Sequence, residues 1–314
     1  MRRVFCSLPL WAALAMAAQK PVTLLDRLRA ADLPAGQRAE LVRLFTAKDY
    51  AGVEDILARA TAAPLAPALA AECHALEGAV AFLEGRMDRA VTSLRQADAL
   101  TPLDDQDRFT LAMGLVRLGD TRPAREQLMR LTVAHPDVPL YLYWLARIDY
   151  DQRLYEQAVE KLRRVILLDP ESSRAYDNLG LALDMLGQTD EARQAFEKGV
   201  DLNRKLTEPS GWPPQDLGAL LLRMQQFKEA ELALREALRY NSALPMAHYH
   251  LGRTLEAEGR DNEAINEYRA ATAGAAPVVE AFYSLGLLYR RHDRGREAEA
   301  VFAEYRKWKA QSAQ

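Results

Sequence analysis

The chain has 314 residues, 49% of them hydrophobic and 27% charged, with a formal net charge of −3 at pH 7. This composition is typical of a globular protein and excludes a collagen-like or intrinsically disordered chain. The pI is about 6.0, and lysines and arginines are interleaved with acids along the chain, so no basic face for nucleic acid is expected.

Residues 1–18 have the organisation of a secretory signal peptide. They combine a basic start at residues 2–3, an apolar stretch over residues 4–14 and a small-x-small cleavage sequence ending at Ala17. The apolar stretch falls short of the roughly 20 residues that a bilayer span needs, which favours cleavage over an uncleaved membrane anchor. We therefore expect an exported protein, periplasmic or secreted, that meets a membrane only through this segment if the segment stays uncleaved.

Residues 19–70 predict N-terminal capping helices with a degenerate repeat. The apolar residues with helical spacing around a turn at 48–50 are Leu41, Leu44, Phe45, Ile56 and Leu57. Solenoids need caps at their ends, and a degenerate hairpin would serve that purpose. After cleavage Cys73 is the only cysteine, so no disulfide within the chain is expected, and a small, partly buried side chain is favoured over a reactive thiol.

From residue 71 onward the sequence repeats itself with a period of 34 residues, broken once by an interval of 38. Each repeat has an alanine that follows a glycine or alanine by twelve residues and precedes a leucine or aromatic residue by four. These alanines are Ala90, Ala124, Ala158, Ala192, Ala230, Ala264 and Ala298. Because two apolar-periodic stretches flank a breaker in each repeat, the pattern predicts a helical hairpin, with the small residues where its two helices cross.

Glycines and prolines mark the predicted ends of these helices. The breakers within hairpins are Gly85, Gly119, Gly187 and Gly259, and the prolines at repeat junctions are Pro102, Pro136 and Pro170. A proline lacks the N–H that a helix interior needs, so one helix ends and the next begins at each junction.

The period and the pattern of small, small and large residues resemble the tetratricopeptide repeat family. The resemblance covers most of a repeat domain at 71–314. Its seven repeats are residues 71–104, 105–138, 139–172, 173–206, 211–244, 245–278 and 279–312. The resemblance implies an all-α fold, a right-handed α-solenoid of tandem helix-turn-helix hairpins.

Two places depart from the regular pattern. Four extra residues within 205–214 separate the fourth and fifth repeats, and a tolerated surface loop is favoured there over a hinge or contact loop. The last helix ends with Tyr305 and Trp308, which either pack within the last hairpin or form a self-association surface. A homo-oligomer that assembles through this helix is therefore an open alternative.

The sequence shows none of the common catalytic motifs, whether a glycine-rich phosphate loop, a dinucleotide fingerprint, a nucleophile elbow or a zinc helix. The five histidines do not cluster at metal-ligand spacing. His248 and His250 lie two residues apart, so on a helix they point in different directions. We predict no cofactor, no metal site and no catalytic residue, with an enzyme of unrecognised type as a remote alternative.

The resemblance also implies a binding surface, because in this family the first helix of each hairpin lines a concave groove through positions two, five, nine and twelve of the repeat. The candidate groove residues are Phe109, Tyr143, Arg147, Tyr150, Arg174, Asp177, Trp212, Tyr249, Arg253, Tyr283 and Arg290. Tyrosine and arginine are enriched at binding hot spots, although these rings can instead pack only against adjacent hairpins. The prediction is a non-catalytic scaffold for a protein or extended peptide, in cell-envelope assembly or a multiprotein complex.

Overall fold

The computed structural model describes residues 22–62 and 64–311, and in these ranges all regular secondary structure is α-helical. The predicted signal peptide at 1–18 lies outside the described residues. The described chain forms two compact bodies, an N-terminal body that ends at Leu154 and a C-terminal body that begins at Tyr155. None of the described helices is long and apolar enough to cross a membrane.

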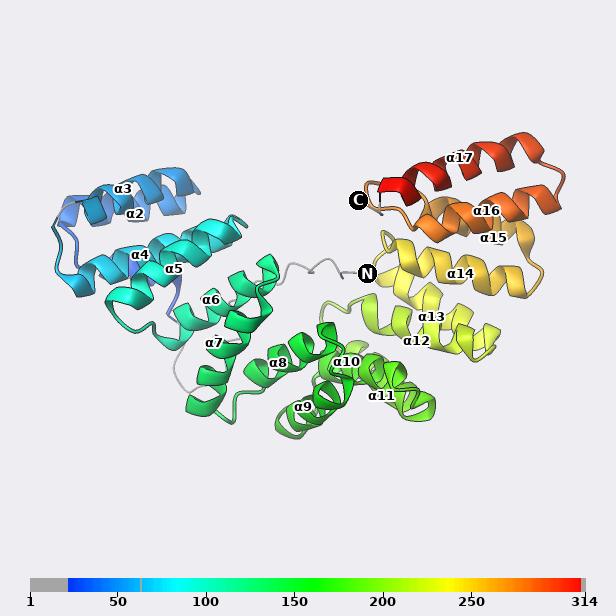
Figure 1. Ribbon diagram of the computed structural model, residues 1–314, viewed down its shortest axis with the longest axis horizontal. Helices are drawn as coiled ribbons and strands as arrows, with labels where there is room; N and C mark the ends of the chain where they lie inside the picture. Colours follow the sequence, from blue (N-terminus) through cyan, green and yellow to red (C-terminus); the bar gives the residue numbers. More distant parts are fainter. Residues whose placement is uncertain (1–21, 63, 312–314) are drawn as a thin grey trace. The chain divides into compact units, whose positions relative to one another are not determined.

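Each body is a series of antiparallel helices (Figure 1). The helices of the N-terminal body are α1 (Leu24–Ala30), α2 (Ala35–Thr46), α3 (Tyr50–Ala62), α4 (Pro67–Leu83), α5 (Met87–Leu100), α6 (Asp105–Leu118), α7 (Thr121–Ala134) and α8 (Pro139–Asp151). Those of the C-terminal body are α9 (Tyr155–Leu168), α10 (Ser173–Met185), α11 (Thr189–Asn203), α12 (Trp212–Arg223), α13 (Phe227–Tyr240), α14 (Pro245–Ala257), α15 (Asp261–Ala271), α16 (Val279–Arg291) and α17 (Gly295–Gln311). Within the bodies, successive helix pairs pack as hairpins, which confirms the all-α solenoid architecture.

The helix crossings occur where the sequence pattern places them. At Gly180 on α10, a Cβ atom would lie 2.6 Å from the ring of Phe196 on α11, so only glycine fits. At Gly252 on α14, a Cβ atom would lie 2.7 Å from the ring of Tyr268 on α15. Both rings are at most 1% exposed. In both hairpins a large side chain of the second helix is therefore buried against a glycine of the first.

The hairpin turns share one backbone feature, a residue in the left-handed region. The four predicted glycine breakers all have positive φ, between 75° and 83°, which confirms their role. In the other hairpins the corresponding turn residue is not a glycine. These residues are Lys48, Arg153, Gln225 and Asp293, with φ between 56° and 62°. The turn geometry therefore recurs even where the sequence lacks the glycine that favours it.

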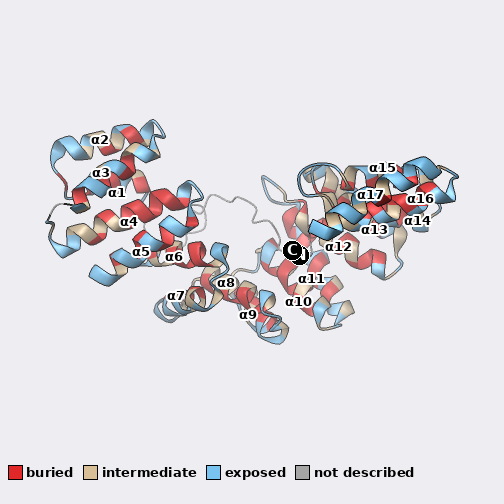
Figure 2. Ribbon diagram, turned by 45° about the horizontal axis from the view of Figure 1, so that its top comes forward, coloured by how far each residue is buried: buried red, intermediate tan, exposed pale blue. Residues whose placement is uncertain are grey.

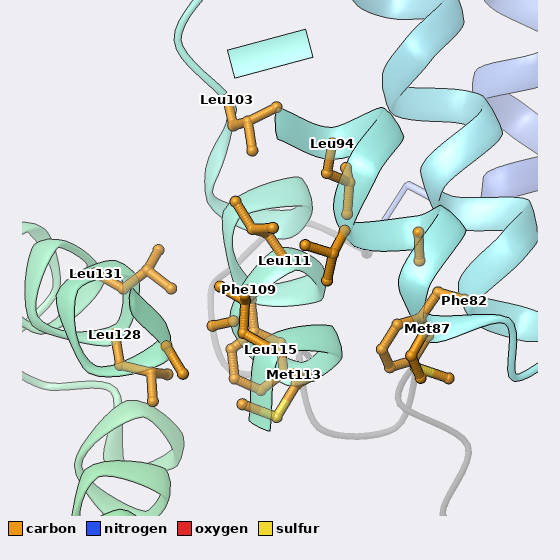
Figure 3. Packing of buried hydrophobic residues seen from close by; sticks show 14 of the residues in the cluster. Phe82, Met87, Leu94, Leu103, Phe109, Leu111, Met113, Leu115, Leu128 and Leu131 are labelled. Carbon is orange, nitrogen blue, oxygen red and sulfur yellow. The ribbon is translucent and has the colours of Figure 1, made fainter. Parts of the chain in front are cut away.

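The core of the N-terminal body lies between neighbouring hairpins. Figure 3 shows Phe109, Leu111 and Leu115 of α6 between side chains of α4 and α5 on one side and Leu128 of α7 on the other. The buried residues form stripes along the faces where helices meet, and exposed residues cover the outer faces (Figure 2). This distribution is what the helical periodicity predicts.

The prediction of N-terminal capping helices over 19–70 does not locate the short helix α1. Its seven residues are too few to show a periodic signal, but Leu24 and Leu28 are at most 2% exposed. The guanidinium of Arg27 donates two hydrogen bonds, of 2.7 and 2.6 Å, to the carboxylate of Asp107 on α6. α1 is therefore held to the first helices of the repeats by apolar contacts and by a bidentate ion pair. Helices α2 and α3 occupy the stretch where a degenerate hairpin is predicted.

The four-residue insertion forms an ordered connection between α11 and α12. Asn203, 1% exposed, receives a 2.9 Å hydrogen bond from the Ser210 backbone N–H and donates one of 2.8 Å to the Ser210 carbonyl. The next residue, Gly211, is buried so closely that a Cβ atom would lie 2.6 Å from Leu244. These contacts fix the end of the loop against the following hairpin and favour a tolerated insertion over a hinge.

Candidate functional site

The first helices of the hairpins carry the predicted groove residues, and in the C-terminal body α10, α12 and α14 lie side by side in that order. On these helices and on α16, the side chains of Arg174, Arg253, Tyr283 and Arg290 are exposed. Trp212 on α12 and Tyr249 on α14 are half-buried. This row of first helices presents arginine and aromatic side chains to the surface at equivalent positions of successive repeats.

Two predicted groove residues are corrected by their burial. Phe109 is only 2% exposed, and its ring packs against Tyr141 at 5.7 Å between centroids. Asp177 on α10 is 4% exposed. A side chain enclosed by neighbouring helices has no surface for a partner, so both belong to the interior and not to the candidate site.

In the N-terminal body, α8 carries the remaining predicted residues, Tyr143, Arg147 and Tyr150, all half-buried. The Tyr143 ring meets Trp144 edge-on at 5.8 Å. These side chains expose part of their surface and also have contacts with the protein. They are weaker candidates for partner contact than the exposed residues of α14 and α16.

Tyr249 and Arg253 form the centre of the candidate site on α14. The Arg253 guanidinium lies over the Tyr249 ring at 5.9 Å, and that ring also packs against the buried Tyr268 at 6.1 Å. Tyr249 is therefore both a packing residue and a surface residue, which combines the two alternatives that the sequence leaves open. Because Tyr268 already restricts the Tyr249 ring, binding of a partner to this ring would cost little side-chain entropy.

The next first helix, α16, presents a large apolar surface. Tyr283 is 47% exposed and Leu287, one helical turn later, is 41% exposed. The Tyr283 ring rests against Phe302 and Tyr305 of α17, at 5.9 and 5.4 Å. Tyr283 and Leu287 occupy the same repeat positions as Tyr249 and Arg253, so the surface continues from α14 to α16.

Ion pairs between successive first helices were missed by the sequence analysis. Asp184 on α10 pairs with Arg223 on α12, and Glu256 on α14 pairs with Arg291 on α16 over 2.9 Å. In both pairs the acid is the twelfth residue of a repeat and the arginine is the thirteenth of the next. The four-residue insertion hides this relation, because it separates the first pair by 39 residues and the second by 35.

Two histidines on α14 have opposite surroundings. Nδ1 of His248 lies 2.6 Å from Glu267, and Nε2 lies 3.1 Å from the Ser242 carbonyl. The hydrogen bond to Glu267 raises the pKa of His248. Burial, and then the charges of Arg253 and Arg223, lower the pKa of His250 to about 4. The Nδ1 atom of His250 is buried and has no hydrogen-bond partner among the described residues.

The described residues contain no group of three or more His, Cys, Asp or Glu side chains that could hold a metal ion. Cys73 is fully buried, and burial followed by the charges of Glu72 and Glu77 raises the pKa of its thiol to about 11. A thiol with this pKa remains protonated at neutral pH and is a poor nucleophile. The side chains exposed or half-buried at the candidate site are aromatic rings and guanidinium groups.

Comparison with known proteins identifies the repeat. A family model for the tetratricopeptide repeat matches residues 109–158, 145–205 and 216–278, just over half of the chain. The human protein "Tetratricopeptide repeat protein 13" is 27% identical over 141 residues, which are 45% of this chain and 16% of that protein. The type IV pilus assembly protein PilF of Pseudomonas aeruginosa is 27% identical over 122 residues, 38% of this chain and 48% of PilF. The chain thus matches less than half the length of each of these curated relatives.

Solved structures show the same fold. A tetratricopeptide repeat protein from Parabacteroides merdae has a TM-score of 0.65 at 16% identity, covering 81% of this chain and 97% of that one. The crystal structure of PilW, described as a widely conserved type IV pilus biogenesis factor, has a TM-score of 0.57 at 20% identity and covers 64% of this chain and 91% of PilW. The Parabacteroides merdae structure covers more of this chain than the family model matches, so the similarity in fold includes residues outside the matched ranges.

Proposed function

Because this chain belongs to the tetratricopeptide repeat family, we propose that it is a non-catalytic scaffold that binds an extended segment of a partner protein or peptide. The proposed binding surface consists of the first helices of the hairpins. In the C-terminal body its principal residues are Arg174, Trp212, Tyr249, Arg253, Tyr283 and Arg290. Tyr143, Arg147 and Tyr150 form a separate candidate surface on the N-terminal body.

One observation carries this proposal. Tyr283 and Leu287 expose large apolar surfaces on a first helix, beside a tyrosine and an arginine at the equivalent positions of the preceding repeat. Exposed apolar surface next to stacked aromatic and arginine side chains is typical of protein interfaces. Part of each of these side chains stays exposed after packing, and partner binding would give that exposed part a physical role.

The cellular role is proposed from two further observations. Residues 1–18 have the pattern of a signal peptide, and the matched regions of PilF and PilW come from type IV pilus proteins. We propose that the protein is exported, loses its signal peptide, and serves in cell-envelope assembly or in another multiprotein complex. The mass of the intact protein isolated from its native host tests cleavage, and a chain that retains Met1 would contradict it.

Self-association through α17 is less well supported. Val301, Tyr305 and Trp308 are all half-buried, and the described part of α17 has no exposed large hydrophobic side chain. The first helix α16 therefore exposes more apolar surface than the last helix α17 does.

Capture from an envelope extract of the native host tests the proposed function. Tyr249→Ala, Arg253→Ala and Tyr283→Ala should each reduce partner recovery, with losses of about 1 to 2 kcal/mol in binding free energy. Leu232→Ala is the matched control, because Leu232 is a large side chain, 71% exposed, on the second helix α13. Equal recovery by all variants would place the binding surface elsewhere.

A further inference from the structure

The first helix α4 of the N-terminal body is enclosed at positions where the first helix α16 is open. Ala75 and Ala79, at positions five and nine of the first repeat, are 5% and 8% exposed. Tyr283 and Leu287, at the same positions of the seventh repeat, are 47% and 41% exposed. The positions of α4 that correspond to the proposed binding surface are therefore already covered by the protein itself.

The short helix α1 lies on the first helices of the N-terminal body. It packs against α2 and α4, the first helices of two successive hairpins, and reaches α6 through its ion pair. Leu24 and Leu28 are four residues apart, so they share one face of α1, and both are buried. They belong to the same core cluster as Leu76 and Ala79 of α4. An amphipathic helix of a partner that bound these first helices would present an apolar face in the same way.

Arg27 anchors α1 in an acidic pocket at the start of α6. Its guanidinium donates hydrogen bonds of 2.7 and 2.6 Å to the two carboxylate oxygens of Asp107, and the two side chains are only 14% and 5% exposed. Asp104 lies beside this pair, because its Oδ1 accepts a 2.8 Å hydrogen bond from the Asp107 backbone N–H. Burial lowers the pKa of Arg27, but the hydrogen bonds to Asp107 and the charges of Asp107, Asp104 and Glu72 raise it above its usual value. The pocket therefore favours a cationic side chain, and two-pronged binding to a carboxylate favours arginine.

Three properties make α1 easy to exchange for another helix. Its seven residues are fewer than the roughly 12 to 15 that an isolated helix needs to be even marginally stable in water, so α1 is helical only while it is docked. Residues 31–34 alone connect it to α2, so it can leave by a movement of this connection while the hairpins stay in place. The desolvation of a buried arginine and aspartate offsets much of their attraction, which limits how tightly the ion pair holds α1.

We propose that α1 is a displaceable internal ligand of this surface, and that a partner helix with two apolar residues four positions apart and an arginine directly before the second binds α2, α4 and α6 in its place. While α1 is docked it is an autoinhibitory contact, because a short connection keeps it at an effective concentration on the order of millimolar. A partner must exceed that competition, or α1 must first be released. This inference goes beyond the proposed function, since it concerns neither the surface of the C-terminal body nor the candidate residues on α8.

Binding of a fluorescent peptide with the sequence of residues 22–33 to the full chain tests this inference. The wild-type protein should bind the peptide weakly, because its own α1 competes for the same surface. Arg27→Glu places a carboxylate beside Asp107 and should release α1, so this variant should bind the peptide at least about tenfold more tightly than the wild type. A second peptide, with glutamate in place of the arginine that corresponds to Arg27, should not bind this variant.

Arg29→Glu is the matched control, because it makes the same change of charge two residues further along α1. The Arg29 side chain is 58% exposed and lies 3.4 Å from Asp26 of α1 itself. This variant should bind the peptide as weakly as the wild type does. Arg27→Glu combined with Asp107→Arg reverses the ion pair, so it should restore the docking of α1 and abolish binding of the arginine-containing peptide.

Hydrogen exchange of the wild-type protein adds a measurement that needs no substitution. The hydrogen-bonded amides of α1 should exchange faster than those of α4 and α5, because α1 opens without the hairpin. Equal protection of these helices would make α1 an integral part of the fold and overturn the proposal. Equal peptide binding by Arg27→Glu and Arg29→Glu, or release of α1 in Arg27→Glu without peptide binding, would overturn it as well.

Discussion

The Tyr268 hydroxyl donates a 2.7 Å hydrogen bond to Oε2 of Glu256, so a fully buried aromatic of α15 is tied to an acid on the adjoining first helix. The other oxygen of this carboxylate accepts from Arg291 on α16 over 2.9 Å. One carboxylate therefore joins the interior of the sixth hairpin to the surface of the seventh.

Because Tyr268 contributes both a buried ring and a hydrogen bond, we expect two substitutions at this residue to lower the free energy of unfolding by different amounts. Tyr268→Ala should destabilise the protein by roughly 3 to 5 kcal/mol, because it removes a buried ring that fills the helix crossing. Tyr268→Phe keeps the ring and loses the hydrogen bond, at a cost of about 1 kcal/mol. Chemical denaturation measures both. Similar unfolding free energies for the two variants would show that the ring does not hold the hairpin together.

The close contact at Gly180 predicts that even one added methyl group is unfavourable. Gly180→Ala places a carbon 2.6 Å from the Phe196 ring and should cost about 1 to 3 kcal/mol, and Gly180→Leu should cost more. Gly36→Ala is the control, because Gly36 lies in α2 with no atom within 4 Å of the added carbon. That control should gain about 0.5 to 1 kcal/mol from lower backbone entropy. Equal effects on the denaturation midpoint would contradict the helix crossing.

The left-handed turn residues predict a stabilising substitution. Gln225 has φ of 59° between α12 and α13, a conformation that costs a side-chain-bearing residue roughly 1 kcal/mol. Gln225→Gly should therefore raise the unfolding free energy by about 0.5 to 1 kcal/mol. In contrast, Leu232→Gly, at an exposed position inside α13, should lower it by about 1 kcal/mol or more. A loss of stability in Gln225→Gly would mean that its side chain supports the turn.

The sequence could predict the hairpins because their signals are local or strictly periodic. The spacing of Gly180 and Phe196 predicts a helix crossing because the same spacing recurs in the other repeats, and the structure shows that crossing. The left-handed conformation of Gln225 could not be predicted, because glutamine, unlike glycine, is not a residue type that indicates a positive φ. Capping helices were expected over 19–70, but the position of α1 could not be predicted because its burial depends on contacts with residues far along the chain, such as that of Arg27 with Asp107.

The candidate site was harder to predict than the fold. A repeat position specifies which face of a helix a residue occupies, but neighbouring helices decide how much of that face stays exposed. Phe109 and Tyr283 both sit at position five, yet Phe109 is 2% exposed and Tyr283 is 47% exposed. The ion pair of Asp184 with Arg223 likewise depends on how successive repeats pack, across an insertion that breaks the period.

His250 predicts a loss of stability in acid. Its native pKa of about 4 is below the value near 6.5 expected when unfolded, so the folded protein keeps the ring neutral. The contribution of the neutral His250 ring to the free energy of unfolding is fully present above about pH 6.5 and is lost as the pH falls towards 4. Between pH 8 and pH 5, wild type should lose on the order of 2 kcal/mol more unfolding free energy than His250→Gln. Parallel pH profiles for the two proteins would contradict this burial.

His248, two residues earlier, predicts the opposite dependence. Its native pKa is raised by the hydrogen bond to Glu267, so the protonated ring is favoured in the folded protein. That stabilisation is fully present below about pH 6.5 and is lost as the pH rises through the native pKa. His248→Gln should therefore destabilise the protein more at pH 5 than at pH 8, whereas His250→Gln should show the reverse order. Denaturant titrations of both variants at the two pH values decide the matter, because equal destabilisation by His248→Gln at both would show that the pair with Glu267 gains nothing from protonation.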